Sequence, residues 1–247
     1  MKGHYMNIGE LIGVGYTADV YEWEKDKVLK LFYKDYPKEA IKKEYNNALA
    51  IREMDFLKPK AYDIISYDER RGIIYDNVRG ESLLDWVMKS GDVQQCALYM
   101  SKLHKEIIKN EIHDVPNYKE FLRDNIPDIL SPDEQNELLQ RIGRLEEGST
   151  LCHGDFHPGN ILISKGQLYV IDFMNVCHGN YLYDIARTVF LVEYTPVPPE
   201  ADNRGEIMQF KKALADMYLE QMNVTREMIQ EYLSIIIIVR KGECPNE

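Results

Sequence analysis

The chain has 247 residues, of which 45% are hydrophobic and 11% aromatic, a composition typical of a folded globular protein. At this length folding buries roughly 70–75% of the surface that the unfolded chain exposes, so one large domain or two lobes can form. The 41 acidic residues exceed the 30 basic ones, giving a net charge of −11. This charge disfavours a nucleic-acid partner, because affinity for a phosphate backbone depends mostly on lysine and arginine.

The sequence also argues against a membrane protein and a disulfide-stabilised one. Its most apolar segment, residues 234–239, is far shorter than the roughly 20 residues needed to span a bilayer. The first seven residues lack the apolar stretch of a signal peptide. The cysteines are scattered without a Cys-x-x-Cys pair: Cys96, Cys152, Cys177 and Cys244. We therefore expect reduced thiols, a cytoplasmic protein and no membrane contact.

The N-terminal part of the chain predicts a small, mostly antiparallel β-sheet with one helix against it. Apolar runs of strand length alternate with turns, at residues 8–12, 20–23, 27–32, 61–67 and 72–75. Between the third and fourth runs, residues 38–54 carry apolar side chains at helical spacing. Residues 1–76 are therefore expected to form a sheet-rich N-lobe.

Beyond a hinge at residues 77–80 the pattern changes to helices. Asp92 and Gln95 have the spacing of a capping box, and Ser131 followed by Pro132 marks another helix start. Helices are expected at 81–89, after 92, after 131, and at 183–192, 207–222 and 226–239, with short strands at 161–163 and 168–171 and a loop at 195–199. Residues 81–247 thus predict a helical C-lobe, and the expected fold class is α+β.

Three polar residues in the C-lobe suggest a metal and phosphate site. Asp155 and Asn160 lie in a loop directly before an apolar run, and Asp172 ends the next run. Each alone is more often a turn or cap residue. Together they can converge on one point, where a few oxygen ligands that leave room for phosphate suit Mg²⁺. Asp155 would then face an acceptor hydroxyl.

This motif resembles that of a known group of enzymes. His-Gly-Asp-x-His-x-x-Asn at 153–160, followed by Ile-Asp-Phe at 171–173, is similar to the signature of the aminoglycoside phosphotransferase and choline kinase superfamily. The resemblance implies a two-lobed, protein-kinase-like fold. It also implies that Asp155 is the catalytic base, that Asn160 and Asp172 are magnesium ligands, and that His153 supports the loop.

The N-lobe carries a glycine-rich hairpin that fits the same picture. Gly13 and Gly15 join two predicted strands, and small residues there let backbone N–H groups approach phosphate oxygens. Such a hairpin is more often only a turn, and Ala18 stands where the fuller Gly-x-Gly-x-x-Gly pattern has its third glycine.

Lys30 is the stronger N-lobe signal. Strand alternation places it between Val28 and Phe32 on one face, and a lone charge buried there is costly without a partner. It resembles the phosphate-anchoring lysine of the kinase fold. Its partner is expected on the following helix, with Glu44 preferred and Glu39 as the alternative.

The remaining resemblances concern the nucleotide base and one helix. Val20 and Val28 would cover the adenine, and the backbone of Asp76 and Val78 would bind it. Gly80-Glu-Ser-Leu also resembles the family, as does Tyr-Asp-Ile-Ala at 183–186, in which Asp184 caps a helix or braces the catalytic loop.

Other interpretations remain open at this point. Zinc ligand types occur at Cys152, His153, His157, Cys177 and His178, although their spacing fits no common structural zinc site. A small atypical protein kinase is the enzymatic alternative, but the sequence lacks the Asp-Phe-Gly and Ala-Pro-Glu motifs. A nucleotide-binding pseudoenzyme is the non-enzymatic one. His104, on an apolar helix face, is expected to be a hydrogen-bonded core residue.

The sequence therefore predicts a phosphotransferase that uses ATP (or GTP) and Mg²⁺ to phosphorylate a hydroxyl of a small polar molecule, in a monomer or weak homodimer. The acceptor, bound in the C-lobe, would be aminoglycoside-, choline- or sugar-like. A cationic acceptor is suggested by acidic residues in the last part of the chain: Glu193, Glu200, Asp202, Glu206, Asp216, Glu220 and Glu227.

Overall fold

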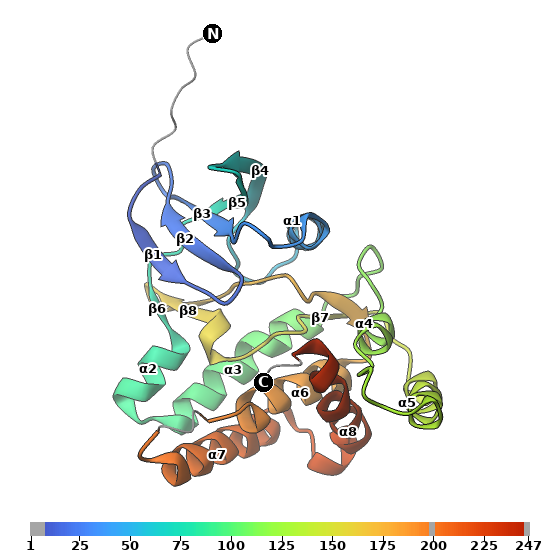
Figure 1. The fold of residues 1–247 in the computed structure, drawn as a ribbon. Coiled ribbons are helices and arrows are strands. Elements are labelled where there is room, and N and C mark those ends of the chain that lie inside the picture. The colour runs from blue at the N-terminus through green and yellow to red at the C-terminus, as the bar shows by residue number, and fades with distance from the viewer. Residues whose placement is uncertain (1–7, 198–200, 245–247) are drawn as a thin grey trace.

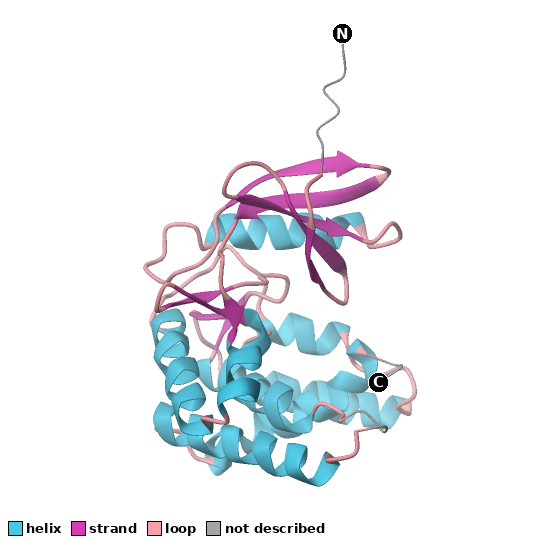
Figure 2. Ribbon diagram, turned by 90° about the vertical axis from the view of Figure 1, so that its left-hand side faces the viewer, coloured by secondary structure: helices cyan, strands magenta, loops and turns pink. Residues whose placement is uncertain are grey.

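The computed structural model of this chain describes residues 8–197 and 201–244. A twisted sheet with one helix lies above a larger group of helices (Figures 1 and 2). We keep the names N-lobe and C-lobe for these two parts, and the boundaries of the lobes and hinge stay predictions. Residues 1–7, together with Pro198, Pro199 and Glu200 of the expected loop and acidic set, lie outside the described part.

The N-lobe sheet has five antiparallel strands in the order β1-β2-β3-β5-β4. Its strands are β1 (Leu11–Val14), β2 (Ala18–Glu22), β3 (Lys27–Phe32), β4 (Ala61–Tyr67) and β5 (Arg70–Asp76). Helix α1 (Lys38–Ala50) packs on this sheet. Phe32 of the central strand and Ile41 of the helix are buried in the same core cluster. The predicted strands and helix are present, although the first strand, expected at residues 8–12, runs from Leu11 to Val14 and includes Gly13.

Helix α1 is shorter than the expected range of 38–54. The helix ends at Ala50, and the next three residues form a turn in which the amide of Ile51 still bonds to the carbonyl of Asn47. Ile51 is buried and Met54 partly buried against the core. Since these side chains reach the core from a turn, the apolar spacing extended the prediction beyond the true helix end.

The C-lobe is built from seven α-helices and short strands within the described residues. The helices are α2 (Leu83–Ser90), α3 (Val93–Ile108), α4 (Tyr118–Asp124), α5 (Pro132–Arg144), α6 (Tyr181–Val189), α7 (Arg204–Met222) and α8 (Arg226–Glu243). The strands are β6 (Glu81–Ser82), β7 (Thr150–Cys152), β8 (Ile161–Ser164), β9 (Gln167–Val170) and β10 (Cys177–Gly179). Helix α3 packs on α7, and α6 on α8. No helix among the described residues is long and apolar enough to cross a membrane.

Several C-lobe elements differ from the expectation. The first helix begins at Leu83 with Ser82 as its cap, because residues 81–82 pair with β8. Helix α6 begins at Tyr181, and a π-helical turn, Phe190–Tyr194, replaces its expected end. Helix α4 and the pair β7–β10 were not predicted, since seven-residue and three-residue elements are too short to show a period.

The predicted helix starts are borne out by their caps. Ser131 and Glu134 form a complete capping box at the start of α5. The carboxylate of Asp92 accepts a hydrogen bond from the amide of Gln95 at the start of α3. These caps set the register of two long helices, and α3 carries the buried residues Met100 and His104 beneath the site described next.

Candidate active site

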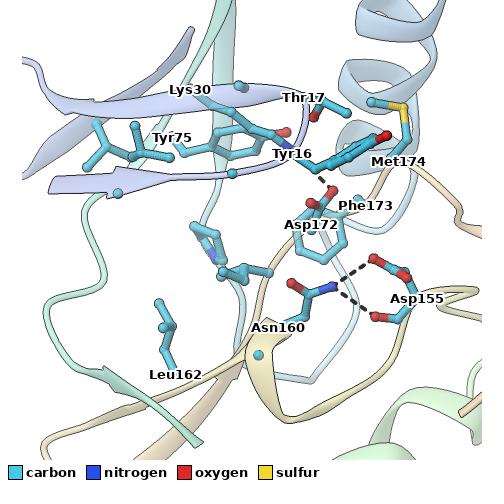
Figure 3. A pocket seen from close by; sticks show the side chains of 18 of the residues that line it. Tyr16, Thr17, Lys30, Tyr75, Asp155, Asn160, Leu162, Asp172, Phe173 and Met174 are labelled. Atoms are coloured by element: carbon cyan, nitrogen blue, oxygen red, sulfur yellow. Dashed lines mark hydrogen bonds and ion pairs between the residues drawn. The ribbon is translucent and has the colours of Figure 1, made fainter. Parts of the chain in front are cut away.

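A cleft of about 1500 Å³ separates the lobes, and every residue that the sequence singled out for phosphate or magnesium binding lines it. Lys30 reaches it from β3, and Asp155, Asn160 and Asp172 reach it from the loops around β8 and β9. Figure 3 shows these four side chains gathered around one space. Polar groups far apart in sequence, from 30 to 172, therefore share one site.

Lys30 is the centre of an ion-pair cluster. Its Nζ lies 2.8 and 2.9 Å from the two carboxylate oxygens of Glu44 and 3.1 Å from Oδ1 of Asp172. Glu44, on α1, is buried, whereas the alternative partner Glu39 is exposed on the first turn of that helix. The hydroxyl of Tyr75 donates to Oε1 of Glu44 at 2.9 Å and holds that carboxylate from the hinge side. Sequence reasoning missed Tyr75, since a tyrosine ending an apolar strand gives no distinct signal.

The opposite charges of Lys30 and Asp172 stabilise each other, whereas burial and the neighbouring Asp172 raise the pKa of Glu44. Burial alone would lower the pKa of Lys30, but the carboxylates of Asp172 and Glu44 raise it above its ordinary value. Burial would raise the pKa of Asp172, but the Lys30 ammonium outweighs burial and the pKa lies below its ordinary value. The cleft therefore holds a fixed positive charge beside an ionised carboxylate.

Asp172 is held in an unusual backbone conformation. Its φ is +67°, in the left-handed region that side chains other than glycine rarely adopt. The next residue is anchored to α1, because the side-chain amide of Asn47 donates to the Phe173 carbonyl at 2.8 Å in a buried position. Two contacts from the N-lobe, by Lys30 and Asn47, thus keep the Asp172 carboxylate turned toward the lysine.

Asp155 and Asn160 are linked within one loop. The side-chain nitrogen of Asn160 donates to the carbonyl and to Oδ2 of Asp155, each at 2.9 Å. This contact leaves the amide oxygen of Asn160 on the side away from Asp155 (Figure 3). The turn before Asp155 requires Gly154: its φ is +74°, and a Cβ there would lie 2.2 Å from the carbonyl oxygen of Asn175.

A buried network behind the loop holds it in place. The carboxylate of Asp184, on α6, accepts hydrogen bonds from the amides of His153 at 2.7 Å and Gly154 at 2.8 Å. It also contacts Nε2 of His104 at 2.9 Å, while Nδ1 of His104 lies 2.5 Å from the Tyr218 hydroxyl. His104 is therefore the hydrogen-bonded core residue that the sequence predicted, and Asp184 braces the loop.

The upper side of the cleft is formed by the N-lobe hairpin and by the segment that leads to the C-lobe. The lining there includes the predicted residues Gly13, Gly15, Val20, Val28, Asp76 and Val78. Tyr16, at the tip of the hairpin, is 93% exposed and stands over the cleft. The carboxylate of Asp76 is held from outside by the Tyr62 hydroxyl at 2.6 Å and the Lys60 amide at 3.0 Å.

The residues present fit a magnesium ion better than zinc. Among the described residues, no three His, Cys, Asp or Glu side chains form a group that could hold a metal. Cys152 on β7 and Cys177 on β10 lie opposite each other in the antiparallel strand pair. His153 and His178 instead contact backbone carbonyls. The cleft offers the oxygen donors of Asn160 and Asp172, a set that suits Mg²⁺ because that ion binds through one or two protein oxygens plus phosphates.

Comparisons with known proteins agree with this geometry. The profile of the phosphotransferase enzyme family matches residues 9–218, which is most of the chain, and the chain belongs to that family. Methylthioribose kinase of Geobacillus sp. (strain WCH70) is 30% identical over 77 residues. This match spans 30% of the present chain and only 19% of that kinase.

Solved structures show the same fold. Amicoumacin kinase, solved with AMP-PNP and Ca²⁺, matches with a TM-score of 0.59 and 18% identity, over 96% of this chain and 80% of its own. Aminoglycoside phosphotransferase APH(3'')-Id from Streptomyces rimosus, solved with ADP and streptomycin, matches with a TM-score of 0.58 and 15% identity over 90% of each chain. The expected α+β, protein-kinase-like fold and the superfamily resemblance are confirmed.

The acidic residues that suggested a cationic acceptor lie elsewhere. None of the set that falls within the described residues lines the cleft. Glu193 and Asp216 instead accept hydrogen bonds from Arg226 at the start of α8. The acidic composition of this region therefore gives no argument for a cationic acceptor.

Proposed function

We propose that this protein transfers the γ-phosphoryl group of ATP, or of GTP, to a hydroxyl group of a small polar molecule. The observation that carries the proposal is the meeting of Lys30 with Asp155, Asn160 and Asp172 along one cleft between the lobes. Membership of the phosphotransferase enzyme family supports this class of reaction.

The nucleotide would lie under the hairpin. Val20 and Val28 would cover its base, and the backbone of Asp76 and Val78 would bind the base edge. The Lys30 ammonium, held by Glu44, would contact the phosphates. Because Lys30 is fixed by carboxylates before the nucleotide arrives, little ordering of its side chain is left to occur on binding.

Asn160 and Asp172 would hold the magnesium ion. A bound magnesium ion would neutralise negative charge on the phosphates during transfer. The structure supports this role because the side-chain nitrogen of Asn160 donates hydrogen bonds to Asp155. The amide oxygen of Asn160 is then left to bind the metal. The ionised state of Asp172, favoured by Lys30, supplies the second oxygen.

Asp155 would orient the acceptor hydroxyl and accept its proton. Its Oδ2 accepts the Asn160 hydrogen bond, so the direction of the carboxylate is set before the acceptor binds. Phosphoryl transfer of this kind depends mainly on positioning and charge stabilisation. A carboxylate held by a neighbouring amide and by the loop behind it meets the first of these requirements.

The acceptor would enter where the hairpin tip faces the C-lobe. The lining on this side includes Tyr16, Met174, Asn175, Arg240 and Glu243. This lining is polar and mixed in charge, which fits a hydroxyl-rich acceptor. The relatives named above act on a thioribose sugar or on antibiotics, and a sugar-like or aminoglycoside-like acceptor is proposed on that likeness.

An acceptor screen tests the proposal. Purified protein with Mg²⁺ and ATP or GTP is offered methylthioribose, other sugars, homoserine, choline, aminoglycosides and a protein substrate, and ADP or GDP release is measured. Steady release with a small hydroxyl compound is the expected result. The Asp155→Asn variant should be roughly 10²–10⁴-fold slower in turnover with an unchanged KM for the nucleotide.

The other outcomes separate the alternatives. Phosphorylation of the protein substrate alone would show a protein kinase. Tight nucleotide binding with no release above the Asp155→Asn rate for any acceptor would favour a pseudoenzyme. Success with neutral acceptors and failure of every amine would exclude a cationic acceptor.

A further inference from the structure

A buried arginine connects the loop that carries Asp155 to the last helix of the described chain. Arg187, on α6, has no solvent exposure. Its Nε donates to the carbonyl of Gly154 at 3.0 Å. Its two terminal nitrogens donate to the two carboxylate oxygens of Glu243, one of them at 2.9 Å. The guanidinium is therefore held in one orientation by a fork of hydrogen bonds.

Arg187 completes the fixation of Gly154. The amide of this glycine donates to Asp184, and its carbonyl accepts from Arg187, one turn further along the same helix. Both backbone polar groups of Gly154, the residue before Asp155, are thus bound to α6. Glycine adopts positive and negative φ about equally readily, so these contacts select the positive φ of Gly154.

The other end of this connection lies at the cleft. Glu243 is the last residue of α8 and lines the cleft on the acceptor side. A second contact, from Arg240 at 3.1 Å, joins it to the previous turn of α8. This helix has no recognisable motif. Through Arg187, however, its last residue is connected to the Gly154 carbonyl, which belongs to the peptide bond before Asp155.

Electrostatics agree with this arrangement. Burial alone would lower the pKa of Arg187, but Glu243 and, more weakly, Asp155 raise it above its ordinary value. The guanidinium stays charged, so a buried Arg187 needs Glu243 as its partner. The end of α8 is therefore tied to the loop at any pH at which Glu243 is ionised.

We propose that Arg187 and Glu243 are positioning residues for phosphoryl transfer: they use the end of α8 to hold the Gly154 carbonyl, and with it the direction of Asp155. This inference rests on the proposed function. It gives α8 a role in the reaction, in which the helix that borders the acceptor also fixes the base.

The test compares two glutamates of α8. Glu243→Gln keeps the size and one acceptor oxygen of the side chain but removes the charge. Glu231→Gln is the matched control, because Glu231 makes a similar fork with Arg141 on the surface, away from the cleft. Arg187→Lys is the second variant, since it keeps the charge and loses the fork.

Two measurements are made on each full-length variant, at a temperature well below its own melting midpoint. The first is kcat and KM for ATP with the best acceptor from the screen. The second is amide hydrogen exchange in peptides covering residues 151–157. We expect kcat to fall roughly tenfold or more for Glu243→Gln and Arg187→Lys, with KM for ATP within about twofold of wild type and faster exchange in this loop. Glu231→Gln should match wild type in both.

If Arg187 and Glu243 only stabilise the fold, their substitution would lower the melting temperature and leave kcat and loop exchange unchanged. That result would overturn the proposal. Unchanged loop exchange in Glu243→Gln would overturn it as well. If wild-type protein phosphorylates no acceptor, the proposed function fails, and the exchange measurement alone decides whether Arg187 and Glu243 hold the loop.

Discussion

Asp172 is the C-lobe residue that two side chains of the N-lobe hold in place. Lys30 binds its carboxylate at 3.1 Å, and Asn47 of α1 binds the next carbonyl. A positive φ costs a non-glycine residue of the order of 1–3 kcal/mol, so this conformation persists only because neighbouring groups enforce it. Such strain is expected where a carboxylate must point at a ligand and not at solvent.

Replacement of Asp172 should therefore remove metal-dependent nucleotide binding. In Asp172→Ala, we expect titration calorimetry to find the same weak ADP affinity with Mg²⁺ as with EDTA, because one of the two oxygen donors is lost. Asp155→Asn serves as the control and should keep the magnesium effect. A magnesium effect of wild-type size in Asp172→Ala would contradict the proposed role.

A second residue-scale prediction concerns pH and the buried Asp184. Burial would raise its pKa, but His104, His153 and the Gly154 amide outweigh burial and lower it. A lowered pKa stabilises the fold above the unfolded-state value of about 4, and this stabilisation is lost as the pH falls below it. Urea unfolding should therefore show Asp184→Asn to be less stable than wild type at pH 5, with a smaller difference at pH 3. An equal difference at both pH values would contradict this.

At the scale of elements, glycines show where the hinge packs tightly. A Cβ at Gly80 would lie 2.1 Å from the carbonyl oxygen of Ile163, so the hinge passes directly against β8. In α5, by contrast, nothing lies within 4 Å of a Cβ at Gly143. Gly80→Ala should destabilise the protein and weaken nucleotide binding. Gly143→Ala should stabilise it by roughly 0.5–1 kcal/mol, since alanine favours a helix.

Chemical denaturation of both variants and ADP titration measure these effects. The glycine-to-alanine change is the same in each, so opposite signs would come from the surroundings alone. Wild-type nucleotide affinity in Gly80→Ala would show that the hinge shifts without affecting the cleft.

The elements also show what the sequence can predict. Elements such as α3 and the N-lobe strands were predicted, because burial of one face makes apolar residues recur with the period of a helix or a strand. The paired strands β7 and β10 have three residues each and were missed. For the same reason, helix ends such as Ala50 were misplaced where core residues continue into a turn.

For the candidate site, sequence reasoning singled out residues that stand in a motif and gave no signal for Tyr75, Arg187 or Glu243, whose contacts are long-range. Lys30, Asp155 and Asp172 stand in recognisable patterns, and the structure brings them into one cleft. The pair of Arg187 and Glu243 is separated by 56 positions and belongs to no pattern. Only the packing of α6 on α8 brings these two residues together.

At the scale of the whole molecule, specific polar contacts join the two lobes beside the cleft. The Lys30–Asp172 ion pair is one, and the buried hydrogen bond from Asn47 to the Phe173 carbonyl is another. Glu44 and Asn47 lie three residues apart on α1 and therefore face the same side. Through them one helix of the N-lobe sets both the lysine and the strained turn of the C-lobe.

This arrangement predicts that Asn47 couples the lobes. Asn47→Ala removes the 2.8 Å hydrogen bond to the Phe173 carbonyl and leaves only the longer one, of 3.4 Å, from the Val176 amide. This loss should destabilise the protein by about 0.5–1.5 kcal/mol. It should also reduce the gain in melting temperature that Mg²⁺ and ADP give together, because Asp172 is then held less firmly. Asn46→Ala is the matched control, since Asn46 is the exposed neighbour on the same helix. A thermal-shift series with ADP alone, Mg²⁺ alone and both ligands separates the two effects. If the melting temperature falls but the gain from Mg²⁺ and ADP together is undiminished, Asn47 stabilises the fold without coupling the lobes.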